Sequence, residues 1–341
     1  MKKQKPIALI RTDGGNKIGM GHIFRSVALS QELKKKGFQI HFLITENKEI
    51  MNNLRKFGKC HFSSKNEYDE IDEIGKIEPE IIIIDLLKKF FPYEERYFKL
   101  LKKICKLLVT IDYSGKELEY VDLGFHSLFG PKKNRAKKTF FDLKYRIVKD
   151  DFIKESKNYK LRKIIKSILI LQGGADTYCI SPKIIKAVAK IQTELKISVV
   201  VGQSFNCWEE ITHLKKNLGK KLTVLHDVDN IHKIMAHHQI VISAAGTTLT
   251  ELLTIGIPTL VVYGQEHEKE MAEIVRKKKM AIILGNGRKI SQKKISLATT
   301  KLLNDFTLRK YLSLNSKKNM KYNGKEKIVE IILKNYLKKA V

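Results

Sequence analysis

The feature that most constrains the fold of this chain is a series of short, almost wholly apolar runs, each closed by a polar or small residue. Ile81–Ile84 is followed by Asp85, and Leu107–Ile111 is followed by Asp112. Such runs are typical of parallel strands whose two faces are both covered by helices. The stretches between them carry apolar residues at helical spacing. The sequence therefore predicts an α/β protein built on parallel sheets.

The alternation of strand, loop and helix occurs in two sets. The first set contains Ile7–Ile10, a helix over Ile23–Lys36 that Gly37 ends, and Ile40–Ile44. A basic, irregular stretch from residue 130 to residue 152 interrupts the alternation, and we expect the join between domains there or just beyond. The second set has five further apolar runs: Ser167–Leu171, Ile197–Val201, Leu222–Leu225, Ile240–Ile242 and Thr259–Tyr263.

The length of the chain, 341 residues, exceeds what one compact core needs and suits two domains. We predict an N-terminal Rossmann-like domain over residues 1–150 and a C-terminal one over residues 151–341, which includes the lysine-rich terminal helices. Open parallel sheets bind ligands beyond the carboxyl ends of their strands. The two domains are therefore expected to face each other across a cleft.

Basic residues dominate the charged composition, with 66 Lys and Arg against 36 Asp and Glu and a formal net charge of +30. Such a field attracts anions, so phosphate ligands, nucleic acid and anionic membranes all stay open as partners. The lysines are spread in short runs such as Lys34–Lys36 and Lys277–Lys279, as on a solvated helical surface. Because no nucleic-acid reader motif is present, a specific nucleic-acid partner is not expected.

No apolar run approaches the roughly 20 residues that a membrane-spanning helix needs. The apolar stretch after the basic N-terminus, Pro6–Ile10, is too short for a secretion signal. The four cysteines form no CxxC pair, which predicts neither a zinc site nor a disulfide framework: Cys60, Cys105, Cys179 and Cys207. These three features lead us to expect a cytoplasmic protein. We also expect a monomer, and peripheral membrane contact is left open.

The loop Arg11–His22 joins the first strand to the first long helix and is the first candidate site. Its glycines, Gly14-Gly15 and Gly19-x-Gly21, allow the backbone to approach a ligand closely, although their spacing is not GxGxxG. His22 stands at or near the helix N-terminus, where the helix dipole disfavours an imidazolium. A neutral imidazole there can accept a proton. Packing or capping of the turn explains this histidine equally well.

Two loops of the second half are candidate phosphate sites. Gln172–Asp176 follows a buried strand, and its paired glycines either expose backbone amides to a phosphate or make a plain tight turn. Ser243–Glu251 brings small and hydroxyl residues to a helix N-terminus, which favours a diphosphate cradle. Glu251 lies one turn into that helix, where it can accept hydrogen bonds from a ribose. Its alternative role is to offset the helix dipole.

Two apparent metal motifs are discounted. Asp227-Val228-Asp229 has the DxD pattern of some metal-dependent glycosyltransferases, but the helical run after it is more typical of a helix cap. His237-His238 lacks the i, i+4 spacing of a helical metal site, and His226 with His232 lacks a third ligand nearby. We expect no metal and no cofactor.

Six segments, in this order, resemble a known family of sugar-nucleotide hydrolases. The most specific are Arg11-x-Asp13 and Ile18-Gly19-x-Gly21-His22-x-x-Arg25. The others are Tyr145-Arg146-Ile147-Val148-x-x-Asp151-Phe152, Gly173-Gly174-x-Asp176, Gly246-x-Thr248-x-x-Glu251 and Asn323-Gly324-Lys325-Glu326-Lys327-Ile328. The family is the UDP-2,4-diacetamido-2,4,6-trideoxy-β-L-altropyranose hydrolase of pseudaminic-acid biosynthesis, and the resemblance covers most of the chain.

This resemblance implies a GT-B-like α/β fold with two Rossmann-like domains. It implies that His22 is the general base, which activates water for attack at the anomeric carbon and releases UDP and the free amino-sugar without a metal. Glu251 would hold the ribose, the turn 246–248 the diphosphate, and the backbone around Val228–Ile231 the uracil. His267-Glu268 aligns with an Asn-Gln pair that lies near the sugar in the family.

The substrate-binding and nucleotide-binding residues expected from these segments are Asp13, Gly19, Gly21, Arg25, Gly173, Gly174, Asp176, Val228, Ile231, Ala245, Gly246, Thr247, Thr248, Glu251, His267 and Glu268.

Two alternatives to hydrolysis remain open. A GT-B glycosyltransferase would pass the same kind of sugar from a UDP donor to an acceptor, at a membrane surface where a net charge of +30 would help. Such an enzyme should carry an apolar, basic-rimmed patch, for which Lys88-Lys89-Phe90-Phe91-Pro92-Tyr93 is the candidate. A basic nucleic-acid-binding protein ranks lower, because no reader motif supports it.

Overall fold

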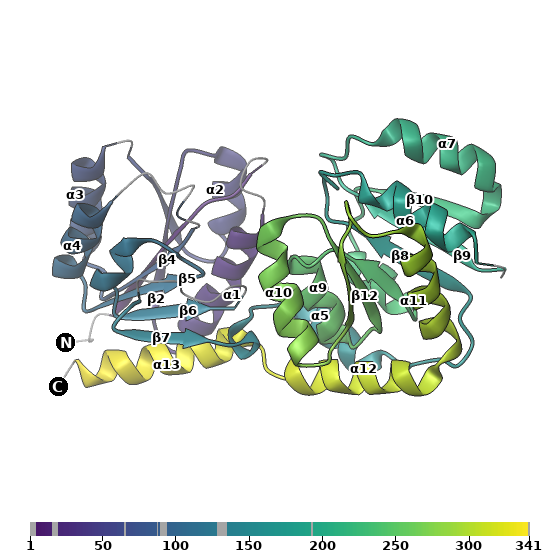
Figure 1. Cartoon of the computed structure of the whole chain (residues 1–341). Helices are drawn as coiled ribbons and strands as arrows, with labels where there is room; N and C mark the ends of the chain where they lie inside the picture. Colours follow the sequence, from purple (N-terminus) through teal and green to yellow (C-terminus); the bar gives the residue numbers. More distant parts are fainter. Residues whose placement is uncertain are drawn as a thin grey trace. The chain divides into compact units, whose positions relative to one another are not determined.

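A computed structural model of the chain contains two compact units, which are described separately. Unit 1 comprises Met1–Lys149 and Tyr322–Val341, and unit 2 comprises Asp150–Lys321 (Figure 1). The residues that the structure describes are 5–15, 20–64, 66–86, 88, 94–127, 135–191 and 194–339, without the side chain of residue 267.

Unit 1 is built on a seven-stranded parallel sheet with the strand order β3-β2-β1-β4-β5-β6-β7. From β1 the chain first adds β2 and β3 on one side of the sheet and then adds β4 to β7 on the other side. The direction in which strands are added therefore reverses between β1 and β4, and we call this position the reversal point of the sheet. The strands are β1 (Ile7–Thr12), β2 (Gln39–Ile44), β3 (Lys59–Phe62), β4 (Ile81–Asp85), β5 (Leu107–Ile111), β6 (Leu123–His126) and β7 (Lys138–Phe141).

Helices cover both faces of this sheet, as the apolar strands predict. The core on one face includes residues of the helices α1 and α2, and the core on the other includes residues of α3 and α4. The helices and 3-10 helices are α1 (Gly21–Lys35), α2 (Lys48–Leu54), α3 (Glu67–Ile77), α4 (Glu95–Ile104), η2 (Lys116–Tyr120), η3 (Leu143–Tyr145) and α13 (Gly324–Lys338).

The last helix corrects the predicted domain organisation. We predicted that residues 151–341 form the second domain, but α13 belongs to unit 1 (Figure 1). Ile328, Val329 and Ile332 are fully buried in the core that also contains α1. The backbone N–H of Gly324 donates to the carbonyl of Arg146 at 2.9 Å, which fastens the start of α13. This long-range packing leaves no signature in the local sequence.

Unit 2 is built on a six-stranded parallel sheet with the strand order β10-β9-β8-β11-β12-β13. Here the strand sequence reverses between β8 and β11. The strands are β8 (Ser167–Leu171), β9 (Lys196–Val201), β10 (Leu222–His226), β11 (Val241–Ser243), β12 (Thr259–Tyr263) and β13 (Ile282–Asn286). The predicted strands of both halves are confirmed, and so is an α/β fold of two parallel-sheet, Rossmann-like domains.

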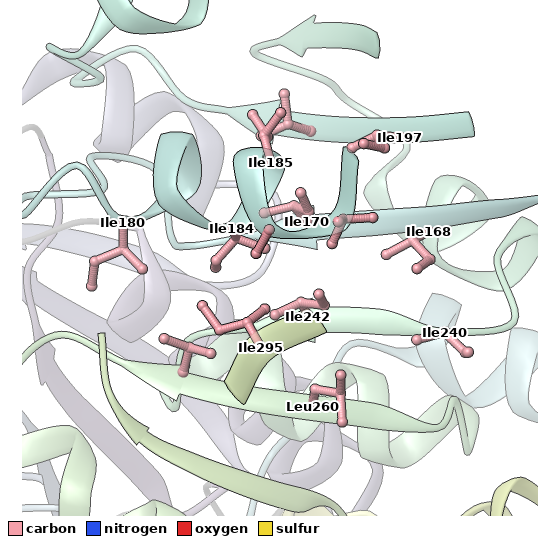
Figure 2. Close-up of a cluster of buried hydrophobic side chains, with 14 of the residues drawn as sticks. Ile168, Ile170, Ile180, Ile184, Ile185, Ile197, Ile240, Ile242, Leu260 and Ile295 are labelled. Atoms are coloured by element: carbon pink, nitrogen blue, oxygen red, sulfur yellow. The ribbon is translucent and has the colours of Figure 1, made fainter. Parts of the chain in front are cut away.

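A layer of buried aliphatic side chains fills one face of this sheet (Figure 2). Ile168, Ile170 and Ile242 on β8 and β11 meet Ile184 from α6 and Ile295 from α11. The helices and the 3-10 helix of unit 2 are α5 (Asp150–Asn158), α6 (Ile180–Ala189), α7 (Trp208–Leu218), η4 (Gly219–Lys221), α8 (Ile231–His237), α9 (Thr247–Ile255), α10 (Glu266–Lys277), α11 (Gln292–Asn304) and α12 (Phe306–Asn319).

A disulfide in unit 2 corrects the prediction that the cysteines form none. Cys179 and Cys207 are bonded, with their Cα atoms 5.8 Å apart, and they are separated by 28 positions in the sequence. Each is the residue just before a helix, α6 or α7. Because those helices follow the neighbouring strands β8 and β9, the strand order brings the two sulfur atoms together, which spacing in the sequence does not reveal.

In the part of the chain that the structure describes, no helix is both long and apolar enough to cross a membrane. The candidate acceptor segment Lys88–Tyr93 falls almost wholly outside the described residues.

Candidate functional site

The reversal point of unit 1 lies between β1 and β4, and it gathers polar side chains. In open parallel sheets a crevice forms at the carboxyl ends of two strands whose connections run in opposite directions. Asp85 is the last residue of β4, and His22 is the second residue of α1, the helix that follows β1. Both side chains therefore come to the same edge of the sheet.

His22 and Asp85 form a buried hydrogen-bonded pair. Nδ1 of His22 lies 2.8 Å from Oδ1 of Asp85; His22 is 9% exposed and Asp85 is fully buried. Because an ionised carboxylate only accepts hydrogen bonds, we assign the proton to Nδ1, which donates it to Asp85. In this tautomer the lone pair lies on Nε2, and this nitrogen can take a proton from a hydroxyl group.

Arg25 lies one turn further along α1 and holds the same carboxylate. Its Nε lies 2.9 Å from Oδ2 of Asp85, its Nη2 also donates to Asp85, and its Nη1 lies 2.6 Å from Oδ2 of Asp112. Ser26 donates from its hydroxyl to Asp85 at 3.2 Å. The backbone N–H of Ser127 donates to Asp112 at 2.7 Å. The guanidinium is thus fixed between two carboxylates, each of which has further donors.

These contacts keep the side chains of Asp85 and Arg25 ionised. Burial by itself raises the pKa of Asp85, but the positive charge of Arg25 and the hydrogen bonds from Arg25 and His22 lower it to about 2. Burial alone would lower the pKa of Arg25. The negative charges of Asp85 and Asp112 outweigh this effect and raise the pKa above its ordinary value. Asp85 therefore stays ionised near neutral pH and remains an acceptor for the Nδ1 proton of His22.

Asp13, a predicted ligand residue, is bonded to its neighbours within unit 1. Its Oδ1 accepts from the backbone N–H and the hydroxyl of Thr45 at 2.6 and 2.7 Å, and its Oδ2 accepts from Arg11 at 2.8 Å. Asp13 thereby fastens the loop after β1 to the loop after β2. Gly21 is the exposed first residue of α1, and Gly19 lies outside the described residues.

The reversal point of unit 2, between β8 and β11, carries a pocket of about 180 Å³. The pocket lies at the carboxyl ends of the strands, where the loops after β8, β11 and β12 meet. Its lining residues are Gln172, Gly173, Gly174, Ala175, Asp176, Thr177, Tyr178, Ile180, Ala244, Gly264, Gln265 and Glu268.

The loop after β8 contains three of the predicted residues. Gly173 has a φ of +78°, a conformation that glycine adopts without strain. Gly174 packs so closely on Gly202 that a Cβ on Gly202 would stand 2.8 Å from the Cα of Gly174. Asp176 accepts the first two backbone N–H groups of α6 at 2.9 and 2.8 Å, so its carboxylate caps that helix.

The helix α9 follows β11, and its N-cap residue is a glycine, which has no side chain to cap the helix. Gly246 is the N-cap residue, and Thr247 and Thr248 are the first two residues of the helix. The first N–H groups of such a helix, together with its dipole, favour an anion. Ala245 is buried before the turn, and Glu251 is half-buried in the second turn.

Glu268 closes the other side of this pocket. Its Oε2 accepts the backbone N–H groups of Gly264 and Gln265 at 2.8 and 3.1 Å. A Cβ built on Gly246 would stand 3.8 Å from Oε1 of Glu268, so the start of α9 and the start of α10 adjoin each other. The side chain of His267 lies outside the described residues.

The segment before α8 contains the residues predicted to contact uracil. Val228 is half-buried, and Ile231 is the half-buried first residue of α8. Asp227 does not cap the helix, contrary to our prediction: the N-cap residue is Asn230, and Asp227 accepts from Gln203 at 2.6 Å. Among the described residues, no group of three or more His, Cys, Asp or Glu side chains is arranged to hold a metal ion.

The sequence pointed to Asp85 and Asp112 only as polar residues at strand ends and did not identify them as partners of His22 and Arg25. The signal was an apolar run closed by an aspartate. Pairing the aspartates with α1 needs the strand order, which places β4 and β5 on the side of β1 away from β2.

Residues 167–330 match the model of the glycosyltransferase family 28 C-terminal domain. Among solved structures, MurG of Acinetobacter baumannii has a TM-score of 0.74 and 14% identity, and the match covers 96% of this chain and all of that one. At such low identity the likeness concerns the fold alone.

Two relatives extend the comparison. The uncharacterized protein MJ1062 of Methanocaldococcus jannaschii is 30% identical over 287 residues, which cover 80% of this chain and 58% of that protein. This chain thus spans little more than half the length of that relative. The spore coat polysaccharide biosynthesis protein SpsG of Bacillus subtilis is 23% identical over 315 residues, or 88% of this chain and 90% of the relative. Together with the strand orders of the two sheets, the structural match supports a GT-B-like fold of two Rossmann-like domains.

Proposed function

We propose that this protein, which has a GT-B-like fold, transfers a glycosyl group from a UDP-sugar to an oxygen nucleophile, with His22 as the general base. The observation that carries the proposal is the buried His22–Asp85 pair, whose Nδ1–Oδ1 distance is 2.8 Å. The hydrogen bond to Asp85 directs the free lone pair to Nε2, as a base for an attacking hydroxyl group requires.

The proposed step is a displacement at the anomeric carbon. The nucleophile oxygen forms a bond to that carbon, its proton passes to Nε2 of His22, and the bond to the diphosphate oxygen breaks, so that UDP leaves. As the ring becomes an imidazolium, the anionic Asp85 stabilises the charge that develops. Arg25 acts as a positioning residue, because it holds Asp85 and does not itself need to touch the sugar.

We assign the leaving nucleotide to unit 2. UDP gains negative charge as the bond breaks, and the first turn of α9, which begins after Gly246, would supply donors and a positive dipole end for it. Glu251 would accept hydrogen bonds from the ribose, and the backbone around Val228–Ile231 would contact the uracil. Gly173 and Gly174 would bring their loop close to the phosphates.

A saccharide or similar alcohol is the acceptor that the comparisons favour. The family model that matches unit 2 is named for glycosyltransferases, and SpsG is named for polysaccharide biosynthesis. Water is the second candidate, which would make the protein a hydrolase of a UDP-linked amino-sugar. The observation that favours it is the segment Ile18-Gly19-x-Gly21-His22-x-x-Arg25, which resembles the pseudaminic-acid pathway hydrolases.

The experiment that decides between them measures UDP release from UDP-sugars, with and without added acceptor. Release that needs the acceptor supports transfer, and equal release in water alone supports hydrolysis. His22→Asn should abolish either. If no UDP-sugar is turned over and the protein does not bind UDP, the proposed function is wrong.

A further inference from the structure

The connection between α5 and β8 is held rigidly at the amino end of the unit 2 sheet, away from the pocket at the carboxyl end. We call residues 160–166 the basic loop. Gln239 accepts the backbone N–H of Arg162 and donates to the carbonyl of Lys160 at 3.4 Å. Arg309 donates to the carbonyl of Lys163 at 2.7 Å. Because Gln239 and Arg309 are 5% and 1% exposed, the loop backbone is fixed by buried groups.

This fixed loop presents one apolar side chain to solvent. Ile164 is 76% exposed, and among the described residues the next most exposed large apolar side chain is Leu297, at 62%. The hydrogen bonds with Gln239 and Arg309 hold the loop backbone immediately before this residue. Ile164 is therefore available to contact an external surface.

The chain segment around Ile164 and the lining of the hollow beside it are cationic. From residue 156 to residue 175 the chain has no Asp or Glu and five Lys or Arg. A hollow of about 580 Å³ lies here, and none of its lining residues is acidic: Arg162, Lys163, Ile164, Lys166, Ser167, His237 and Gln239. The space suits phosphate groups, with an aliphatic side chain at its margin.

We propose that the basic loop docks the protein on an anionic phospholipid membrane. Arg162, Lys163 and Lys166 neutralise lipid phosphates, and Ile164 inserts between the headgroups. Single-stranded nucleic acid fits less well, because it is bound by stacking of successive bases on aromatic side chains, and the lining of the hollow offers one aromatic ring, that of His237. The loop and the nucleotide pocket lie at opposite ends of β8, so docking leaves the pocket open and does not depend on the proposed reaction.

The test is co-sedimentation of the full chain with vesicles. Equal parts phosphatidylglycerol and phosphatidylcholine should bind the protein, and phosphatidylcholine alone should not. Each basic residue near an anionic surface contributes about fivefold to binding, so the triple variant Arg162→Gln, Lys163→Gln, Lys166→Gln should bind about 100-fold more weakly. Ile164→Asn should weaken binding about tenfold.

The surface of α6 and α11 provides a matched control, because it has exposed lysines and an exposed leucine of its own. The triple variant Lys186→Gln, Lys190→Gln, Lys293→Gln and the single variant Leu297→Asn remove the same charge and a similar apolar group. They should leave vesicle binding within about twofold.

Three results would overturn the proposal. Equal losses in the control variants would mean that the net charge alone drives binding. Displacement of the protein from vesicles by millimolar inorganic phosphate would indicate a site for a small anion. Tighter binding to polyuridylate than to vesicles, lost in the same loop variants, would indicate a nucleic-acid surface.

Discussion

The two units carry their candidate sites at equivalent points, where the strand order reverses, but build them from different parts of the chain. Between β1 and β4 the groups are ionisable side chains, His22, Arg25 and Asp85, which bond to one another. Between β8 and β11 they are largely backbone groups from the loop after β8 and the start of α9. A proton transfer needs one nitrogen held in one direction, whereas a diphosphate needs several donors at once.

This contrast predicts that changes in unit 1 affect the rate and changes in unit 2 affect binding. The largest effect should come from His22→Asn, since a general base contributes about 10²–10⁴ to a rate. We expect UDP release to fall by that factor while the dissociation constant of UDP, measured by calorimetry, changes by less than about twofold. Unchanged turnover would remove His22 from the chemistry.

Asp85→Asn and Asp112→Asn form a matched pair, because both aspartates bond Arg25 but only Asp85 contacts His22. Either change leaves a buried guanidinium with one carboxylate fewer, which should lower the free energy of unfolding by about 3 kcal/mol in urea titrations. Asp85→Asn should also lower turnover about 10²-fold, because the imidazolium loses its counter-charge. Equal turnover in the two variants would mean that Asp85 serves stability alone.

The features that could be predicted from the sequence are those with a local signature. Strands that are buried on both faces have continuous apolar sequences, so both sheets were predictable. Glycine-rich loops and a histidine after the first strand mark the candidate sites locally. The pairing of His22 with Asp85 spans 63 positions, and it depends on β4 lying beside β1.

Long-range packing also explains what the sequence did not predict. The return of α13 to unit 1 depends on three buried aliphatic residues that would suit a core in either unit. The disulfide between Cys179 and Cys207 depends on β8 and β9 being neighbours. Asp13 and Asp176 lie where the resemblance led us to expect ligand residues, but their carboxylates bind protein groups and shape the loops.

In unit 2, Gly202→Ala tests whether the loop after β8 must approach the backbone so closely. The added Cβ would stand 2.8 Å from the Cα of Gly174 and push that loop away. Overpacking costs about 1–3 kcal/mol, so we expect UDP to bind about tenfold more weakly with little change in turnover at saturating substrate. Gly75→Ala is the control, because a Cβ there meets nothing within 4 Å. Unchanged affinity would exclude the loop from the nucleotide site.

Glu251→Ala should have the smallest effect, and it separates the nucleoside from the phosphates. If Glu251 accepts hydrogen bonds from the ribose, its loss should weaken UDP binding about fivefold and leave inorganic pyrophosphate binding unaffected. Competition calorimetry with the two ligands measures both constants. Equal losses for UDP and pyrophosphate would make Glu251 a helix residue that acts through the dipole of α9.

The most direct test of the central claim, that Asp85 acts by orienting the ring of His22, is a double-mutant cycle. UDP release at saturating substrate would be measured in His22→Asn, in Asp85→Asn and in the double variant. If Asp85 works through His22, the double variant should be no slower than His22→Asn alone. If the two losses multiply, Asp85 contributes to the rate independently of the histidine, which contradicts a role in orienting the ring of His22.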